Sequence, residues 1–151
     1  MTIKYLSAIP IVLLLLLASI ATVTAAEQSG SPRLRHFQKQ PPADYLGRYN
    51  PLTADQEQQT IGQRLFDQHC TRCHGFGGVG KGLDGDQLTM EPAELIRAAQ
   101  HVFPSDRNGY LYWTIAEGGE PIGSPMPPFK EVLDSKQIWQ IILYINTINY
   151  F

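Results

Sequence analysis

Near its middle the chain contains Cys70-Thr71-Arg72-Cys73-His74, a C-x-x-C-H pattern. This spacing is typical of a polypeptide that binds haem covalently. Two thiols separated by two residues can reach the two vinyl groups on one edge of a porphyrin and form thioethers with them. The histidine that follows then lies beneath the iron, where its neutral imidazole can serve as the proximal axial ligand. The pattern therefore predicts one haem c, bound through Cys70, Cys73 and His74.

Other roles of a C-x-x-C pair fit this chain less well. The same spacing occurs in disulfides, in thioredoxin-like redox pairs and in halves of zinc sites. Cys70 and Cys73 are the only cysteines of the sequence, so it offers no second pair to complete a zinc site. A thioredoxin-like pair belongs to a βαβ pattern, and the sequence around these residues has none. We therefore favour haem attachment.

The N-terminal residues 1–26 have the pattern of a secretory signal peptide. Lys4 precedes an apolar stretch, residues 9–20, and small residues follow up to Ala26. A positive charge, a short apolar region and small residues before the cleavage site are typical of such signals. We expect cleavage before Ala26 or Glu27, and hence export to the periplasm. The alternative is an uncleaved anchor that tethers the protein to the inner membrane, because the apolar region approaches the length of a marginal membrane-spanning helix.

Residues 27–54 differ in composition from the rest of the chain and predict a linker. Prolines and glycines are frequent in this segment and aliphatic residues are few. It contains four Lys or Arg against two Asp or Glu, whereas residues 55–151 contain seven against twelve. A solvated linker explains this difference, and a basic arm close to an anionic membrane surface or a partner is the alternative. Nothing in the sequence indicates nucleic-acid binding.

Residues 55–151 are long enough for one domain and predict short helices joined by loops. Apolar residues recur at helical spacing in residues 55–69, 92–102, 108–117 and 135–149. The last segment has the longest apolar stripe, formed by Ile138, Ile141, Ile142, Ile145 and Ile148. No segment predicts a strand. We expect an all-α domain with long loops wrapped around its haem, because small domains often need a cofactor to complete their core.

A glycine-rich stretch, Gly75-Phe76-Gly77-Gly78-Val79-Gly80, follows the motif and matches G-x-G-x-x-G. It nearly completes a P-loop with Lys81, but a P-loop needs Ser or Thr after this lysine, where the chain has Gly82. A dinucleotide fingerprint needs a preceding strand, and here the haem motif precedes the stretch. We therefore interpret the glycines as residues that let the backbone turn tightly against the porphyrin edge, where a β-carbon would collide.

Met126 is the residue that we favour as the distal ligand of the iron. It lies in Gly123-Ser124-Pro125-Met126-Pro127-Pro128-Phe129, where prolines on both sides restrict the backbone. A thioether is a neutral, soft ligand that favours ferrous iron. Two alternatives stay open. Met126 could only fill the core, as most methionines do, or Met90 could be the ligand.

Three histidines outside the motif are weaker candidates for the distal position. His36 lies in the linker, and His69 directly precedes Cys70 and is expected to point away. His101 ends a predicted helix, where a surface cation suits the helix dipole.

An aromatic cluster in residues 108–117 suggests a wall for the porphyrin. Trp113 lies there beside Tyr110 and Tyr112. Buried Trp and Tyr side chains usually find a hydrogen-bond partner, and a haem propionate is one such partner. Packing in the core without a polar contact is the alternative for Trp113.

The motif and its surroundings resemble the small monohaem cytochrome c family in its His/Met-ligated form, found in exported bacterial electron carriers and in modules of larger redox enzymes. The resemblance covers residues 55–151, and its markers are Gly62, Leu65, Phe66, Cys70 to Gly75, Met126-Pro127, Trp139 and Tyr144. It implies thioethers at Cys70 and Cys73 and axial ligation by His74 and Met126. In that family the first and last helices cross closely, which would place Gly62 and Phe66 against Tyr144.

One feature departs from the pattern of that family. Many members have a proline soon after the glycine-rich loop, and the carbonyl of this proline accepts the N–H of the proximal histidine. Here no proline occurs before Pro92. The sequence therefore leaves open which group orients His74.

The resemblance implies one-electron transfer rather than enzymatic catalysis. With both axial positions occupied, the iron offers no open site to a substrate, and the haem exchanges electrons through its exposed edge. The expected partners are redox proteins, such as a dehydrogenase, an oxidase or a reductase. One alternative is a haem subunit fixed in a membrane oxidoreductase complex, and another is a gas sensor or peroxidase-like enzyme in which Met126 does not hold the iron.

Overall fold

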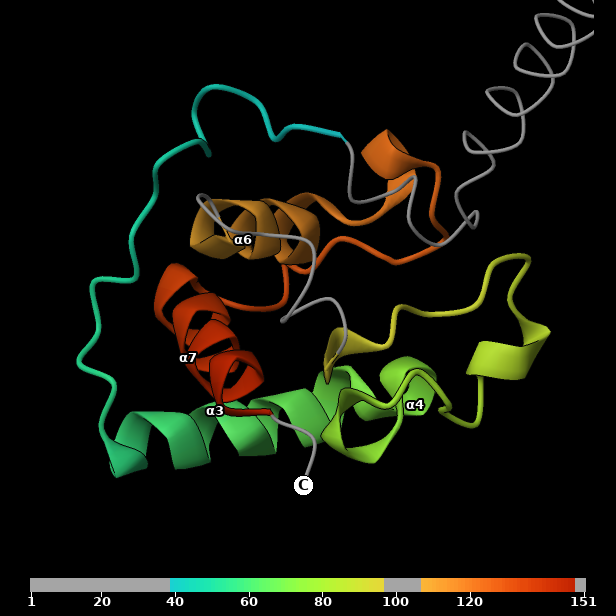
Figure 1. Cartoon of the computed structure of the whole chain (residues 1–151), viewed down its shortest axis with the longest axis horizontal. Helices are drawn as coiled ribbons and strands as arrows, with labels where there is room; N and C mark the ends of the chain where they lie inside the picture. Colours follow the sequence, from blue (N-terminus) through green and yellow to red (C-terminus); the bar gives the residue numbers. More distant parts are fainter. Residues whose placement is uncertain (1–38, 97–106, 149–151) are drawn as a thin grey trace, which may run out of the picture. The chain divides into compact units, whose positions relative to one another are not determined.

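The computed structural model describes residues 39–96 and 107–148, which belong to one of two units of the chain, residues 33–151 (Figure 1). Its elements are α3 (Gln56–His69), α4 (Thr71–His74), η2 (Phe76–Gly78), η3 (Gly85–Gln87), α6 (Arg107–Glu117), η4 (Glu120–Ile122) and α7 (Ser135–Thr147). The described residues contain no strand, so the predicted all-α fold with long loops is confirmed. Among the described helices, none combines the length and the apolar composition that a membrane crossing requires.

Several predictions made from the sequence fall on residues that the structure does not describe. The signal peptide or anchor in residues 1–26, the linker up to residue 38 and the last residues of the chain lie outside the described ranges. So do His36 and His101. Of the predicted helix at residues 92–102, residues 95 and 96 are helical and those after them are not described.

Side-chain caps define where α3 and α7 begin. Asp55 accepts a hydrogen bond from the backbone N–H of Gln58 at 2.9 Å and so caps α3. At α7, Asp134 accepts from the N–H of Gln137 at 2.8 Å, and the Gln137 side chain accepts from the N–H of Asp134 at 2.9 Å. This reciprocal pair is a capping box, which satisfies amides that have no partner within the helix.

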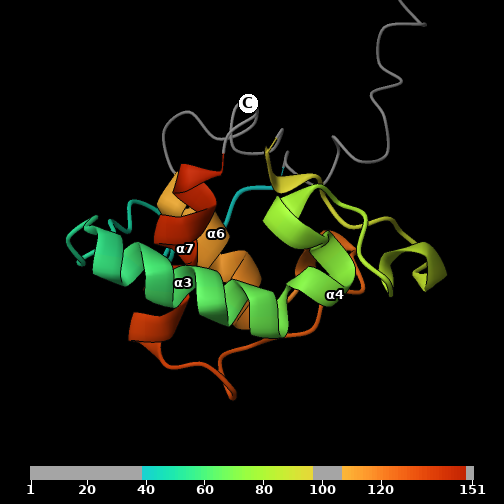
Figure 2. The same ribbon diagram turned by 90° about the horizontal axis from the view of Figure 1, so that it is seen from below.

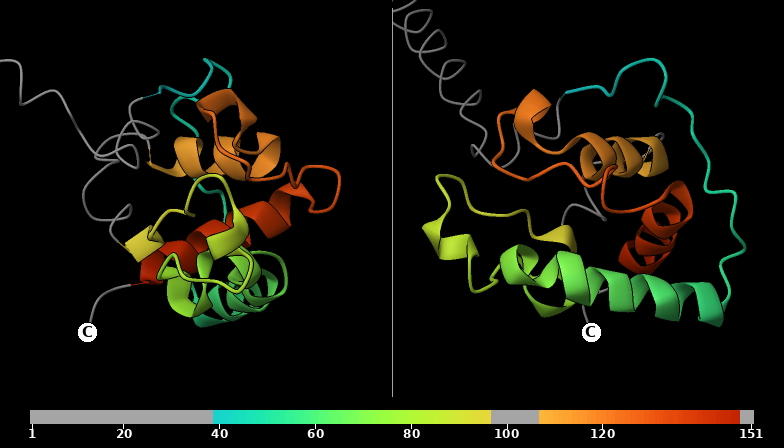
Figure 3. Two further views of the ribbon diagram at one scale, coloured as in Figure 1. Left: turned by 90° about the vertical axis from the view of Figure 1, so that its right-hand side faces the viewer. Right: turned by 180° about the vertical axis from the view of Figure 1, so that it is seen from behind.

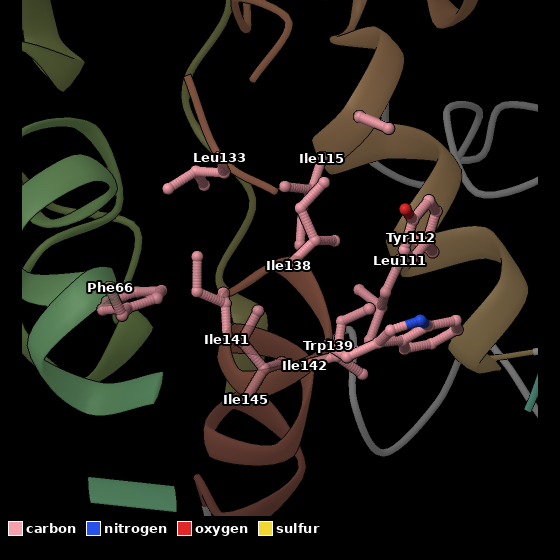
Figure 4. Packing of buried hydrophobic residues seen from close by; sticks show 11 residues of the cluster. Phe66, Leu111, Tyr112, Ile115, Leu133, Ile138, Trp139, Ile141, Ile142 and Ile145 are labelled. Atoms are coloured by element: carbon pink, nitrogen blue, oxygen red, sulfur yellow. The ribbon is translucent and has the colours of Figure 1, made fainter. Parts of the chain in front are cut away.

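The helix α7 forms the centre of the core (Figure 4). The predicted stripe is confirmed for Ile138, Ile141, Ile142 and Ile145, which are all buried, and Ile148 is half-buried. Trp139 and Leu143 are buried as well, so α7 contacts the protein on nearly its whole circumference. Figure 4 shows the Phe66 ring of α3 directed toward Ile141 of α7, with side chains of α6 on the other side. The remaining members of the cluster are Leu111, Tyr112, Ile115, Ala116 and Leu133.

The helices α3 and α7 cross closely, as the family resemblance implies (Figure 2). The contact centres on Gly62, where an added β-carbon would meet the backbone carbonyl of Gln140. One turn along α3, the fully buried Phe66 ring lies against Tyr144, with ring centroids 5.2 Å apart. Helices approach this closely only where a small residue faces the neighbouring backbone. The crossing therefore depends on the glycine and the aromatic pair together.

The segment that precedes α3 packs against α6 and α7 (Figure 3). The Tyr45 hydroxyl donates to Glu117 Oε1 at 2.6 Å, and the Tyr45 ring lies 6.1 Å from that of Tyr112. The Asn50 side chain donates to the Trp139 carbonyl at 2.9 Å. The structure describes residues 39–54 of the predicted linker, and contacts of Tyr45, Asn50 and Leu52 hold this part on the domain.

Gly62→Ala should weaken the crossing of α3 and α7. The new methyl group would collide with the Gln140 carbonyl. Overpacking of this kind costs about 1–3 kcal/mol, and the better helix propensity of alanine returns at most about 1 kcal/mol. Denaturant unfolding should therefore show a lowered free energy of unfolding. The exposed neighbour Gln63→Ala is the matched control and should leave it unchanged, so equal losses in both variants would contradict the close crossing.

Candidate functional site

A largely apolar cavity of about 230 Å³ lies beside the C-x-x-C-H motif. The lining comes from α3, α4, α6 and α7 and from the segments at residues 88–95 and 122–129. They are Phe66, His69, Cys70, Cys73, His74, Leu88, Met90, Glu91, Pro92, Ala93, Leu95, Tyr110, Leu111, Thr114, Ile115, Ile122, Ser124, Pro125, Met126, Pro127, Phe129, Ile141 and Ile145. The cavity thus brings together the motif and the loop of Met126, which are about fifty residues apart in the sequence.

Helical geometry places the motif residues on one face. The backbone N–H of Cys70 ends α3 by donating to Phe66 at 2.8 Å, and the chain enters α4 at once, where the N–H of His74 donates to the Cys70 carbonyl at 2.8 Å. In a helix, positions i, i+3 and i+4 lie on the same side. Cys70, Cys73 and His74 have this spacing, so their side chains reach the same cavity.

The Ala93 carbonyl orients His74. His74 Nδ1 lies 3.0 Å from this oxygen, and because a carbonyl only accepts, Nδ1 carries the proton and Nε2 carries the lone pair. Burial lowers the pKa of the imidazole, which favours the neutral form. A neutral imidazole with Nε2 free is the form that binds a metal.

This acceptor is the group that sequence reasoning did not identify. Ala93 directly follows Pro92, the first proline after the motif. The family pattern led us to look for a proline carbonyl close to the glycine-rich loop. In the structure the acceptor comes nineteen residues after the histidine and one residue beyond the proline. Pro92 was the available signal, because its ring fixes the backbone that leads into Ala93.

Both cysteines are free thiols in this cavity. Burial, with smaller contributions from Cys73 and Asp67, raises the pKa of the Cys70 thiol to about 12. Redox-active cysteines have a lowered pKa, because the thiolate is the attacking species. The environment of Cys70 therefore does not favour a thioredoxin-like role. Among the described residues, no cluster of three or more His, Cys, Asp or Glu has the geometry of a metal site.

The amides of the glycine-rich loop are used within the fold. The N–H of Gly80 donates to the His74 carbonyl at 2.7 Å, and that of Gly82 donates to the Cys73 carbonyl at 3.1 Å. An added β-carbon at Gly82 would meet the Arg72 carbonyl. The loop therefore folds back over α4 and satisfies its last carbonyls. These two amides are therefore engaged within the fold.

The loop that contains Met126 is closed by backbone hydrogen bonds. The N–H of Gly119 donates to the Met126 carbonyl at 2.8 Å, and that of Ser124 donates to the Gly119 carbonyl at 2.8 Å. Gly118 has a positive φ of 78° and faces the Met126 carbonyl and the Pro128 nitrogen, which an added β-carbon would meet at 2.8 and 2.7 Å. The two glycines after α6 thus hold Met126 in place as well as ending the helix.

Of the remaining candidate residues, some line the cavity and Trp113 does not. Met90 and His69 both line the cavity, although we expected His69 to point away. The His69 ring lies edge-on to Phe129, with ring centroids 6.2 Å apart. In the aromatic cluster of α6, Tyr110 lines the cavity, whereas the buried Trp113 packs behind it with ring centroids 5.7 Å apart.

Gly118→Ala should disturb the Met126 loop more than Gly123→Ala does. Both glycines have a positive φ, which costs an alanine about 1–2 kcal/mol. Only Gly118 also has backbone atoms within 3 Å of the added methyl, because Gly123 has nothing within 4 Å. Denaturant unfolding should therefore show the larger loss of stability for Gly118→Ala. Equal losses would mean that the packing at Gly118 is not needed.

A family comparison identifies residues 57–145 with the model described as "Cytochrome C oxidase, cbb3-type, subunit III". The chain is 28% identical to the quinohemoprotein alcohol dehydrogenase ADH IIB of Pseudomonas putida over 147 residues, 87% of the chain. It is 28% identical to the cbb3-type cytochrome c oxidase subunit FixP of Sinorhizobium medicae (strain WSM419) over 89 residues, 59% of the chain. The matches cover only 19% and 29% of these relatives' own lengths.

A solved structure has the same fold. It is the Kuenenia stuttgartiensis reducing HAO-like protein complex Kustc0457/Kustc0458, matched with a TM-score of 0.54 at 21% sequence identity. The match covers 75% of this chain and 52% of that chain. At this identity the likeness supports the fold alone.

Proposed function

Because the chain belongs to the family of cytochrome c oxidase, cbb3-type, subunit III, a family of c-type cytochromes, we propose that it is a one-electron carrier with a single covalent haem. Cys70 and Cys73 bind the haem as thioethers, and His74 and Met126 are its axial ligands. The observation that carries this proposal is the position of all four side chains on one apolar cavity, with His74 oriented by a carbonyl.

The residues of the cavity suit the chemistry of haem attachment. Each thiol adds across one vinyl group, with sulfur bonding to one carbon and hydrogen to the other, so no oxidant or leaving group is needed. The apolar lining excludes water from a large apolar ligand. When bound, haem would supply an iron that gains or loses one electron. The protein holds the neutral imidazole with Nε2 available, and the closed loop presents a sulfur ligand.

Met126 remains our choice for the distal ligand over Met90. Both line the cavity, but Met126 belongs to a loop closed by backbone hydrogen bonds and flanked by prolines. Met90 lies in a segment of bends without regular structure. A ligand that must keep one position in both oxidation states needs a rigid support. His69 is held against Phe129, and we assign it a packing role.

The relatives favour a second candidate function, a haem subunit fixed within an oxidoreductase. One relative is an alcohol dehydrogenase and the other is an oxidase subunit, and in both the matching part is a minority of the protein. A domain of this kind passes electrons between redox partners in either setting. We therefore propose redox proteins as partners, and we place the domain, residues 55–151, on the periplasmic side of the inner membrane, free or tethered through residues 1–26.

The first prediction is covalent attachment of one haem. Mass spectrometry of the denatured protein, expressed with a haem-attachment system, should give the mass of the chain plus one haem. Thioethers survive denaturation, whereas a haem held only by axial ligands dissociates. A Cys70→Ala, Cys73→Ala double variant is the control and should release any haem that it holds. A wild-type mass equal to that of the bare chain would contradict the proposal.

The second prediction concerns the distal ligand. Met126→Ala should remove the sulfur that favours ferrous iron, lower the midpoint potential and let the ferrous protein bind carbon monoxide. Met90→Ala is the matched control from the same cavity and should keep the wild-type potential and exclude carbon monoxide. The reverse pattern would assign the iron to Met90. Ready binding of carbon monoxide by the wild-type protein would favour the gas-sensor or enzyme alternative.

A further inference from the structure

Arg107, the first residue of α6, has two guanidinium nitrogens without a hydrogen-bond partner. Its Nε and Nη2 are buried, and no hydrogen-bond acceptor is within reach of either of them in the described part of the protein. Burial lowers the pKa of this group, a sign of an environment that disfavours its charge. Arginine stays protonated in proteins nonetheless. A buried cation of this kind is stable only with an anion beside it.

Arg107 is not among the residues that line the cavity, but it lies on the face of α6 that borders it. Tyr110, Leu111 and Thr114 line the cavity, and they follow Arg107 at positions i+3, i+4 and i+7. Residues with this spacing share one face of a helix. The next residue, Asn108, accepts a hydrogen bond from the Asn146 side chain at 3.2 Å, which ties the first turn of α6 to α7. The backbone that bears Arg107 is thus fixed.

The start of a helix is an unfavourable place for a cation. The amides of the first turn give it a partial positive charge, which stabilises anions and destabilises cations. The first turn of α6 itself contains no acidic residue, and Asp106, which precedes it in the sequence, lies outside the described residues. The guanidinium and the helix terminus therefore both attract an anion. Among the residues that line the cavity, Glu91 is the one carboxylate, and it lies outside α6.

We propose that Arg107 binds a propionate carboxylate of the haem. This inference rests on the proposed function, because the carboxylate belongs to the cofactor proposed there. A planar guanidinium donates two parallel hydrogen bonds to a carboxylate, which fixes the orientation of the group as well as its charge. Arg107 is thus a positioning residue that sets the rotation of the porphyrin in the cavity and raises the midpoint potential by neutralising a negative charge near the iron.

The test compares three variants of the full-length holoprotein. Arg107→Gln should lower the midpoint potential and shift the propionate band in the oxidised-minus-reduced infrared spectrum. Arg107→Lys keeps the positive charge but lacks the planar guanidinium. Its midpoint potential should therefore stay close to that of the wild-type protein, while the propionate band should still shift. Arg64→Gln, which removes an exposed arginine of α3, is the matched control and should change neither quantity.

The outcomes distinguish this inference from the proposed function. Mass spectrometry first establishes whether the chain holds covalent haem, and a negative result there contradicts the proposed function. If the protein does hold haem, an unchanged midpoint potential and an unchanged propionate band in Arg107→Gln overturn the inference about Arg107. The proposed function is not affected by that result. If Arg107→Gln does not accumulate with haem, Arg107→Lys decides, because an unshifted band in that variant overturns the inference as well.

Discussion

The close crossing of α3 and α7 at Gly62 is the contact on which the rest of the structure depends. Because Gly62 has no β-carbon, α3 lies directly against the backbone of Gln140. This contact fixes α3 against α7, and α3 ends at the C-x-x-C-H motif, with Cys70 as its cap and α4 following at once. A larger residue at position 62 would move the whole motif relative to Ala93 and the Met126 loop. The geometry of the site is thus set by helix packing about two turns away from the first cysteine.

The site combines one helical part with two segments that lie outside helices. The motif is rigid because it continues α3. Ala93 lies in an irregular segment, and Met126 lies in a loop closed by its bonds to Gly119. These segments meet around an apolar cavity, and the hydrogen bond between His74 and Ala93 joins two of them directly. A ligand that binds only the folded chain stabilises it by mass action, and an apolar ligand also removes the lining from water. The haem that the motif predicts would therefore complete the hydrophobic core as well as transfer electrons.

The sequence predicted most of the helices and much of the site, for identifiable reasons. Helical periodicity and a motif of fixed spacing are local signals, so α3, α6, α7 and the alignment of Cys70, Cys73 and His74 follow from short stretches of sequence. The acceptor for His74 does not, because a backbone carbonyl carries no side-chain signature and only the tertiary fold brings Ala93 to it. The sequence around Met90 and Met126 likewise does not reveal that both residues line one cavity. The two unpaired guanidinium nitrogens of Arg107 also become visible only when their surroundings are known.

The contacts of residues 39–52 change the interpretation of the charge difference between the predicted linker and the domain. Two of the basic residues that give the segment its positive charge are held by protein atoms. Lys39 donates to the Pro121 carbonyl at 2.6 Å, and the Arg48 guanidinium lies over the rings of Tyr45 and Tyr112, 4.5 and 5.1 Å from their centroids. The attraction between the guanidinium and the aromatic rings holds the Arg48 side chain in this position. Part of this positive charge therefore fixes the segment to α6 and η4, which leaves less of it for the alternative of a basic arm near a membrane or a partner.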